Sequence, residues 1–294
     1  MPGHGQDRAC GSSPAAEGDT GMSGGCGSKV SPLVGIIGGH GRMGRWFERF
    51  FKGAGLTVLL SDLDGGLDPE EIARRCDVVV LSVPMTTFDD VVRRVGPILG
   101  PDAFLTDLCS LKERQVALML EYTQAETVGT HPLFGPSEES IAGRRVALCP
   151  GRGRRWLGWW EGLMRAHGAL VRVVDAALHD RAMAWVQALN HLLVMSLGMA
   201  LMEDGIDPGD ILDLSTPSFE QQLKVLARLS QQDPRLYAHI QMANPYSADA
   251  LERFFRKAEG LRRIIDNKDW DAFTKTFEEL QGLGSILCGR IQIQ

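Results

Sequence analysis

The sequence lacks paired cysteines. It contains six cysteines among 294 residues, and no two of them stand at the spacing of a CxxC motif. None lies near a histidine at the spacing of zinc ligands. Disulfide frameworks are typical of small secreted domains, whereas a chain of this length has room for an ordinary hydrophobic core. We therefore expect free thiols in a reducing cytoplasm, and no metal site.

The sequence also lacks an excess of positive charge. Its formal net charge is −6 at pH 7, whereas nucleic-acid-binding proteins usually present a basic face. A small anionic substrate is still possible, because a local cluster of arginine and lysine can override the global charge. We expect no nucleic-acid partner.

An apolar leader and a clear membrane span are missing as well. The first 30 residues are polar and rich in glycine, without the apolar core of a secretory signal. Residues 182–202 carry no formal charge, but this stretch includes Gln187, Asn190 and His191, which are costly in lipid. We interpret it as a buried helix, and we expect a cytoplasmic protein that does not enter the membrane.

Glycine, in contrast, is abundant. The chain has 34 glycines, of which eight lie in residues 1–31 among serine and proline. This segment shows no apolar periodicity, so we predict a flexible tail and assign it no function. The remaining length favours two domains.

Residues 32–174 alternate short apolar runs with amphipathic stretches. Most runs are β-branched or rich in leucine and lack polar alternation, as strands buried on both faces do. The predicted strands are 33–37, 56–60, 78–83, 103–105, 127–129, 146–149 and 170–174. This pattern predicts an α/β fold with a mostly parallel sheet.

Residues 175–294 contain no further predicted strand. The expected helices are 177–203, 217–231, 234–243, 246–267 and 269–287. Turn signals such as Asp207-Pro208-Gly209 separate them. Because helix 182–202 is apolar nearly all round, it must be buried on several sides. We therefore expect an all-α domain that covers this surface in a homodimer.

The first predicted strand leads into a glycine-rich loop, Gly38-Gly39-His40-Gly41-Arg42-Met43-Gly44. Gly39, Gly41 and Gly44 form a GxGxxG motif. In dinucleotide-binding folds the first glycine allows a tight turn, the second lets the backbone approach a pyrophosphate, and the third allows close contact between helix and strand. The following helix directs free N–H groups at the phosphates. We therefore predict a Rossmann-type doubly wound sheet, with His40, Arg42 and Met43 also at the cofactor.

Asp62 indicates which dinucleotide binds. It follows the second predicted strand, 23 residues after Gly39. An acid there accepts hydrogen bonds from the ribose hydroxyls and repels a 2′-phosphate, and no arginine follows it closely. We therefore favour NAD over NADP. We expect Ser82, Val83 and Pro84, at the end of the third run, to complete the cofactor site.

Two polar segments follow later strands of the predicted sheet. They are Thr106-Asp107-Leu108-Cys109-Ser110-Leu111-Lys112 and Gly129-Thr130-His131-Pro132-Leu133-Phe134-Gly135-Pro136. Doubly wound sheets bind their ligands at the carboxyl ends of the strands, where both segments are expected. His179 and His191 lie in the first predicted helix of the second domain.

A dinucleotide-binding domain combined with the His-Pro-Leu-Phe-Gly-Pro motif resembles the prephenate and arogenate dehydrogenases. It most resembles the dehydrogenase half of the enteric bifunctional chorismate mutase–prephenate dehydrogenase, over about residues 33–290. The shared segments are the loop of Ser110 and Lys112, the His131 motif, His179-Asp180, Gln187-Ala188-Leu189 with His191, Arg228, Gln232-Asp233-Pro234 and Leu236-Tyr237-Ala238. Their spacing is ungapped from Lys112 to Tyr237, which makes the match specific.

The resemblance implies the oxidative decarboxylation of a cyclohexadiene that bears a ring carboxylate and a pyruvyl side chain. NAD⁺ accepts the hydride, and His131 takes the proton of the ring hydroxyl, a task that suits a neutral imidazole. The resemblance further implies that Ser110 hydrogen-bonds this hydroxyl or orients His131. For His179 and Tyr237, a structural role is as open as a role at the substrate.

The resemblance also implies a set of substrate-binding residues. Arg228 clamps the ring carboxylate, for which an arginine fork is suited, and Lys112 adds positive charge. His191 faces the pyruvyl side chain, with Tyr237 and Gln187 close by. A solvated surface lysine is the alternative for Lys112, and a buried structural histidine is the alternative for His191.

One position departs from the family pattern. Glu220, eight residues before Arg228, stands where the enteric enzyme has an arginine. Either Glu220 points to solvent or to the dimer interface and prephenate is the substrate, or the substrate carries a cation, as 4-amino-4-deoxyprephenate does. Arogenate is a third option.

Two rival classes fit the sequence less well. A β-hydroxyacid dehydrogenase uses a lysine of its helical domain, and the only lysine between residues 175 and 250 is Lys224, in the helix of Arg228 rather than beside His191. A non-catalytic NAD-binding regulator would not need His131 and Ser110 together with Arg228.

Overall fold

The structure is a computed structural model that describes residues 31–290. The tail predicted for residues 1–31 lies outside the described residues, apart from Ser31. The cysteines within the described part are free thiols: Cys76, Cys109, Cys149 and Cys288. Burial raises the pKa of the Cys76 thiol to about 11 and that of Cys149 to about 12, which keeps both neutral. The prediction of free thiols is confirmed for these four, and Cys10 and Cys26 lie outside the described residues.

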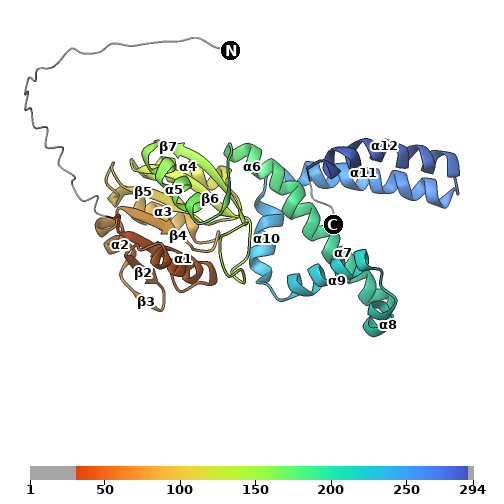
Figure 1. Cartoon of the computed structure of the whole chain (residues 1–294), viewed down its shortest axis with the longest axis horizontal. Helices are drawn as coiled ribbons and strands as arrows, with labels where there is room; N and C mark the ends of the chain where they lie inside the picture. Colours follow the sequence, from red (N-terminus) through yellow and green to blue (C-terminus); the bar gives the residue numbers. More distant parts are fainter. Residues whose placement is uncertain (1–30, 291–294) are drawn as a thin grey trace, which may run out of the picture. The chain divides into compact units, whose positions relative to one another are not determined.

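Eight strands form one sheet in the order β3-β2-β1-β4-β5-β6-β7-β8 (Figure 1). The strands are β1 (Val34–Ile37), β2 (Val58–Asp62), β3 (Gly65–Gly66), β4 (Val78–Leu81), β5 (Phe104–Asp107), β6 (Glu126–Pro132), β7 (Arg145–Arg152) and β8 (Leu170–Val173). The five strands from β2 to β6 in this order are parallel, β3 and β7 run antiparallel to β2 and β6, and β8 is parallel to β7. The predicted α/β fold is confirmed, and only the two-residue β3 was not predicted.

Strand β4 shows why these runs are uniformly apolar. All four of its residues are buried. Val78 and Val80 belong to the core on one face of the sheet, and Val79 and Leu81 to the core on the other. Because side chains alternate across a strand, both faces must be apolar when helices cover both.

Each face of the sheet has its own helices. α1 (Arg42–Gly53) and α5 (Arg155–Ala166) contribute aromatic side chains such as Phe47 and Trp160 to the first core. α2 (Pro69–Arg75), α3 (Phe88–Val95) and α4 (Glu113–Tyr122) supply the second core, with a short 3₁₀ helix at Gly96–Ile98 after α3. This doubly wound arrangement leaves the carboxyl edge of the parallel strands for ligands.

The remaining elements are helical, as predicted. They are α6 (Ala176–Met183), a π-helical segment (Ala184–Leu189), α7 (Asn190–Asp204), α8 (Pro208–Asp213), α9 (Pro217–Ser230), α10 (Pro234–Ala243), α11 (Ser247–Asp266) and α12 (Trp270–Cys288). The predicted helix 177–203 is thus interrupted by a π segment. The Asp207-Pro208-Gly209 signal, which we interpreted as a turn, starts the short α8, because Asp207 caps it and accepts from the N–H of Gly209.

The rod formed by α6, the π segment and α7 is apolar. Ala176–Asp204 is long and apolar enough to cross a membrane, with a mean hydropathy of 1.4, although only 17% of it is buried. His179 and Asp180 on this rod are nevertheless buried within the protein. A helix that carries buried, hydrogen-bonded polar groups is typical of a folded domain, so a single helix of this kind is weak support for a membrane span.

Candidate active site

The loop after β1 is shaped by glycines. Gly38 has a φ of +82°, and a Cβ there would lie 2.5 Å from the carbonyl oxygen of Ser82. A Cβ on Gly44 would lie 2.3 Å from the carbonyl oxygen of Gly38. The loop therefore packs tightly against both the end of β4 and the first turn of α1, as the motif requires.

Gly39 lies in the tight turn, where a Cβ would be 2.8 Å from the Leu60 side chain. The left-handed residue of this turn is the preceding Gly38. Gly41 is exposed and precedes α1 without a side-chain cap, so the first N–H groups of α1 are free to bind an anion.

Asp62 lies at the glycine loop, as predicted. It ends β2, and its Oδ2 accepts from the backbone N–H of His40 at 2.8 Å. His40 in turn pairs with Asp64 through Nδ1 and Oδ1 at 2.5 Å. This hydrogen bond is the main reason that the pKa of Asp64 is lowered.

His40, Asp62 and Asp64 offer possible metal-ligand atoms within 4.8 Å of one another, the one such group within residues 31–290. Hydrogen bonding already accounts for their proximity, so we assign no metal to them.

The other predicted cofactor residues differ in their surroundings. Arg42 donates to Gln232, in the connection between α9 and α10, at 3.4 Å. Met43 packs against the first hydrophobic core, so its side chain anchors the glycine loop to that core. Ser82 follows β4 and donates its N–H to the carbonyl of Ile37 at 2.8 Å. The loop at Ser82 therefore lies beside the glycine loop, at the point where strand order reverses between β1 and β4.

His131 lies at the end of β6 and is 3% exposed. Because β1, β4, β5 and β6 are adjacent and parallel, its strand ends at the same sheet edge as the glycine loop. Its Nδ1 lies 3.0 Å from Nε2 of His179. Burial, with His179 and Lys112 adding to it, holds the pKa of His131 well below 6.5. His131 is therefore a neutral imidazole at neutral pH.

The carboxylate of Asp180 contacts the second histidine of this pair, His179. Nδ1 of His179 lies 2.8 Å from Oδ1 of Asp180, and both residues are almost fully buried. Asp180 also accepts from the backbone N–H groups of Lys112 and Glu113, at 2.8 and 2.9 Å. We noted His179-Asp180 as a shared segment but not as the partner of His131. No spacing rule could have linked residues that are 48 positions apart.

Lys112 is not where we predicted. Its side chain is fully buried, and its ammonium group is paired with the carboxylate of Asp107 and donates to the carbonyl of Thr130 at 3.0 Å. Gly129 makes room for it, since a Cβ there would lie 3.0 Å from Cδ of Lys112. The prediction that Lys112 meets the substrate is therefore wrong, and so is the alternative of a surface lysine.

Ser110 lies half-buried in the loop between β5 and α4. No hydrogen bond of its side chain is found within the described residues, and His131 is oriented by His179 instead. Of the two roles predicted for Ser110, orienting His131 is therefore not observed, and hydrogen bonding to a substrate hydroxyl stays a prediction.

A second cluster surrounds His191. The rings of His191 and Tyr237 are 4.5 Å apart, so α7 and α10 meet here. Nδ1 of His191 and Oε1 of Gln187 are buried without a partner. Burial lowers the pKa of His191 and raises that of Tyr237, where the nearby Arg228 opposes the shift. Within the described residues, no hydrogen-bond partner is found for Nδ1 of His191 or Oε1 of Gln187.

Glu220 forms a local ion pair. Its Oε1 lies 2.7 Å from Nζ of Lys224, one helical turn along α9, and both side chains are about half exposed. Arg228 is exposed one further turn along the same helix. The anion at position 220 is thus balanced within its own helix.

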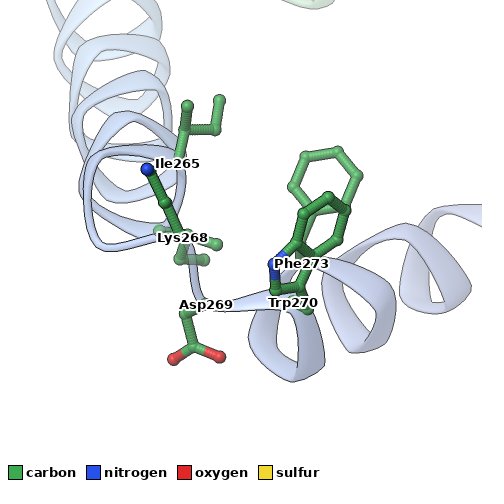
Figure 2. Close-up of a pocket in the computed structure, with 6 residues that line it drawn as sticks. Ile265, Lys268, Asp269, Trp270 and Phe273 are labelled. Carbon is green, nitrogen blue, oxygen red and sulfur yellow. The ribbon is translucent and has the colours of Figure 1, made fainter.

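The two clusters are not joined by a hydrogen bond within the described residues. Twelve residues separate His179 from His191 on the rod, which corresponds to about 18 Å along a helix. A separate hollow lies at the turn between α11 and α12, where Figure 2 shows Ile265, Trp270 and Phe273 around it. That hollow contains none of the predicted site residues.

Comparisons with known proteins agree with this architecture. The family model "Prephenate dehydrogenase, nucleotide-binding domain" matches residues 60–173, and "Prephenate dehydrogenase, dimerization domain" matches residues 175–279. The T-protein of Enterobacter agglomerans is 31% identical over 253 residues, which cover 86% of this chain and 67% of that protein.

Two further relatives are informative. The 4-amino-4-deoxyprephenate dehydrogenase of Streptomyces pristinaespiralis is 30% identical over 84% of this chain and 90% of its own. The crystal structure of prephenate dehydrogenase from A. aeolicus, in complex with hydroxyphenyl propionate and NAD⁺, has a TM-score of 0.70 at 22% identity. It covers 88% of this chain and 99% of its own.

Proposed function

Because the chain belongs to the prephenate dehydrogenase family, we propose that it catalyses the NAD-dependent oxidative decarboxylation of a prephenate-type cyclohexadiene. The products are a 4-substituted phenylpyruvate, CO₂ and NADH. The buried, neutral His131 carries this proposal, because it ends β6 at the sheet edge where the glycine loop lies. A base of this kind is what a hydroxyl that becomes a carbonyl requires.

The residues at the glycine loop fit NAD. The first turn of α1 has free N–H groups for a pyrophosphate, and Gly41 is open on the loop surface. The carboxylate of Asp62, which lies at the glycine loop, would accept hydrogen bonds from the ribose hydroxyls and repel a 2′-phosphate. Held by these residues, NAD⁺ would supply the acceptor for the hydride of the ring carbon. Ser82, Val83 and Pro84 would border its other half.

His131 would accept one proton from the substrate and later return it. It takes the proton of the ring hydroxyl as the carbon–oxygen bond gains carbonyl character and the hydride leaves. Loss of CO₂ returns an electron pair to that oxygen as the ring becomes aromatic, and His131 then gives the proton back to it. Protons therefore balance without any exchange with water. Ser110 is proposed to donate to or accept from the same hydroxyl.

The second cluster would bind the carboxylates. Arg228 is proposed to hold the ring carboxylate with its planar fork. The unpartnered Nδ1 of His191 and the amide of Gln187 are proposed to meet the pyruvyl side chain, with Tyr237 beside them. A buried polar atom without a partner is costly, and a polar substrate would remove that cost.

We favour prephenate as the substrate. The ion pair between Glu220 and Lys224 supports this choice, because Glu220 does not need a cationic substrate to balance its charge. The 4-amino analogue is the second candidate, favoured by the same glutamate and by the similarity to the Streptomyces relative. Arogenate is the third.

A comparison of substrates tests the proposal. The purified protein is assayed with NAD⁺ and each of the three compounds, by the absorbance of the reduced nicotinamide. We expect kcat/KM to be higher for prephenate than for the amino analogue by about tenfold, which corresponds to about 1.4 kcal/mol. A higher value for the amino analogue would overturn the choice of prephenate. No turnover of any compound, alongside NAD⁺ binding, would indicate a non-catalytic binding protein.

Two variants refine the comparison. Glu220→Arg reverses the charge, and Glu220→Gln is the neutral control of the same size. If Glu220 lies outside the site, both variants keep the order of the substrates. If it recognises a cation, Glu220→Arg loses activity on the amino analogue selectively.

We also propose the assembly and setting of the enzyme. The domain boundary lies after residue 174, with the cofactor domain at 32–174 and the substrate and dimerisation domain at 175–294. The match to a dimerization domain supports a homodimer. A cytoplasmic location is consistent with the free thiols.

A further inference from the structure

The groups behind His131 form a linear chain of side chains. Asp180 contacts His179, and His179 contacts His131, at 2.8 and 3.0 Å. The two imidazole rings are inclined by 72° to each other. All three residues are at most 3% exposed. Water therefore does not compete for these hydrogen bonds, and their direction is set by the protein alone.

The direction can be worked out from Asp180. Its Oδ1 accepts from the N–H of Lys112, and its Oδ2 accepts from the N–H of Glu113, where α4 begins. A carboxylate at a helix N-terminus is stabilised as an anion, and here both oxygens act as acceptors. The bond between Asp180 and His179 must then have the hydrogen on Nδ1 of His179.

The remaining protons follow from the chemistry of imidazole. We take His179 in its neutral form, in which an imidazole carries one N–H, so that its Nε2 has a lone pair and acts as an acceptor. Its partner, Nδ1 of His131, must therefore be the donor. Neutral His131 then has its own lone pair on Nε2, the one ring nitrogen that can take a proton.

From this geometry, and resting on the proposed function, we propose that the Asp180–His179 pair is a positioning device for His131. It fixes the tautomer of His131 that carries hydrogen on Nδ1, and so presents Nε2 as the base toward the substrate hydroxyl. Neither Asp180 nor His179 touches the substrate in this proposal. The Asp180–His179 pair acts only through the ring of His131.

The same arrangement gives the protonated state of His131 a hydrogen-bond acceptor, although burial and His179 keep the pKa of His131 low. After taking the hydroxyl proton at Nε2, the imidazolium donates a stronger hydrogen bond from Nδ1 to His179, which is anchored on the Asp180 carboxylate. The charge is thereby offset until the proton returns to the substrate oxygen. No bond other than N–H and O–H changes in this step.

Other charged or titratable groups around His131 do not alter this direction. On the β5 side, Lys112 and Asp107 form a buried ion pair and largely cancel each other. On the β7 side, the thiol of Cys149 stays neutral because burial raises its pKa to about 12. The nearest net charge that faces the histidine pair is therefore the carboxylate of Asp180.

The first test does not depend on turnover. Long-range ¹H–¹⁵N correlation spectra of the full chain, labelled at histidine, distinguish the two tautomers, and His131→Asn assigns the signal of His131. We expect hydrogen on Nδ1 in the wild type at neutral pH. In His179→Phe we expect hydrogen on Nε2. A wild-type spectrum with hydrogen on Nε2 would overturn the inference even if the enzyme is active.

The second test is kinetic. We expect His179→Phe to lower kcat about 10²-fold, the scale of general base catalysis, with little change in KM or in NAD⁺ affinity. The acidic limb of its kcat/KM profile should move to higher pH, since His179 adds to the lowering of the His131 pKa. His179→Gln places an amide oxygen near the position of Nε2 and should recover at least tenfold of the lost rate.

Controls separate positioning from folding. His167→Gln changes an exposed histidine at the end of α5, and should leave kcat and the pH profile unchanged. Equal rates and pH profiles for His179→Phe and the wild type would overturn the inference. If the wild type turns over none of the three compounds while His131 shows hydrogen on Nδ1, the proposed function fails and the positioning pair stands.

Discussion

At the residue scale, Lys112 shows how a family motif can mislead. The sequence places this lysine beside Ser110, so a substrate contact was the natural prediction. The structure instead pairs its ammonium group with Asp107 in the interior. Removing one partner of a buried pair leaves an uncompensated charge, which is far more costly than losing an exposed pair.

Lys112→Met should therefore lower stability. We expect the free energy of unfolding, measured by urea denaturation, to fall by about 3–5 kcal/mol. Lys224→Met is the matched control, because its pair with Glu220 is exposed and contributes about 0.3–0.5 kcal/mol. An unchanged stability of Lys112→Met, combined with a large increase in KM, would restore the role in substrate binding.

The lowered pKa of His131 predicts a pH dependence of activity. Because burial holds this pKa well below 6.5, the acidic limb of kcat/KM for the free enzyme should lie below pH 6.5. His131→Gln should abolish the reaction while NAD⁺ still binds. Half-maximal kcat/KM at pH 7 or above would show that another group is the base.

The same shift predicts a pH dependence of stability. Between the lowered pKa of folded His131 and about 6.5, the unfolded chain binds more protons than the folded protein. The contribution of neutral His131 to the free energy of unfolding is complete above about pH 6.5. It is lost as the pH falls toward the pKa of folded His131, by at most about 1.4 kcal/mol per pH unit. Urea denaturation at several pH values measures this slope, and His131→Gln should reduce it. The slope that remains in this variant should come from His191, whose pKa is also lowered.

Residues of the site could be predicted from sequence where a motif or a resemblance existed. The glycine loop, Asp62 and His131 lie at one sheet edge for that reason, whereas the left-handed φ of Gly38 could not be predicted because neighbouring glycines are equivalent in a pattern. The partnership of His131 with Asp180 could not be predicted, since it depends on how α6 packs on α4. A sequence pattern holds no information on that contact.

At the element scale, the strands and long helices followed from periodicity and caps. The exception is the π segment, Ala184–Leu189, which is built from ordinary helix formers. α10 and the Asn244 that follows it hold the rod within and before this segment: Gln241 donates to the carbonyl of Ala188 and Asn244 donates to that of Asp180, each at 2.8 Å. Tertiary contacts, rather than propensity, thus accompany the irregular turn.

Asn244→Ala should weaken this contact. The substitution removes one of the two hydrogen bonds of the Asp180 carbonyl, which keeps the bond from the N–H of Ala184, so we expect a loss of about 0.5–1.5 kcal/mol in the free energy of unfolding. Amide hydrogen exchange across residues 176–189 should also become faster. Asn190→Ala, at an exposed asparagine of the same rod, is the control and should change neither quantity. Equal exchange in both variants would show that α10 does not hold the rod.

At the scale of the whole molecule, the helical part exposes a large apolar surface. Large side chains on α7, α11 and α12 are strongly exposed: Met199 67%, Met202 84%, Phe255 54%, Trp270 80%, Phe277 59%, Leu280 59% and Ile286 60%. Exposed apolar patches of this kind mark interaction surfaces. Since the family model for this part is that of a dimerization domain, a second copy of the chain is the expected cover.

Light scattering after size-exclusion chromatography tests this assembly. We expect twice the chain mass of 32.2 kDa for the full chain. Phe277→Glu with Leu280→Glu introduces two charges into the apolar face of α12 and should yield monomers, because buried unpaired carboxylates are costly. Lys275→Glu adds negative charge elsewhere on the same helix and should leave the dimer intact. If the wild type is a monomer at micromolar concentration but floats with liposomes, the apolar rod binds lipid instead, and both the dimer and the cytoplasmic location are wrong.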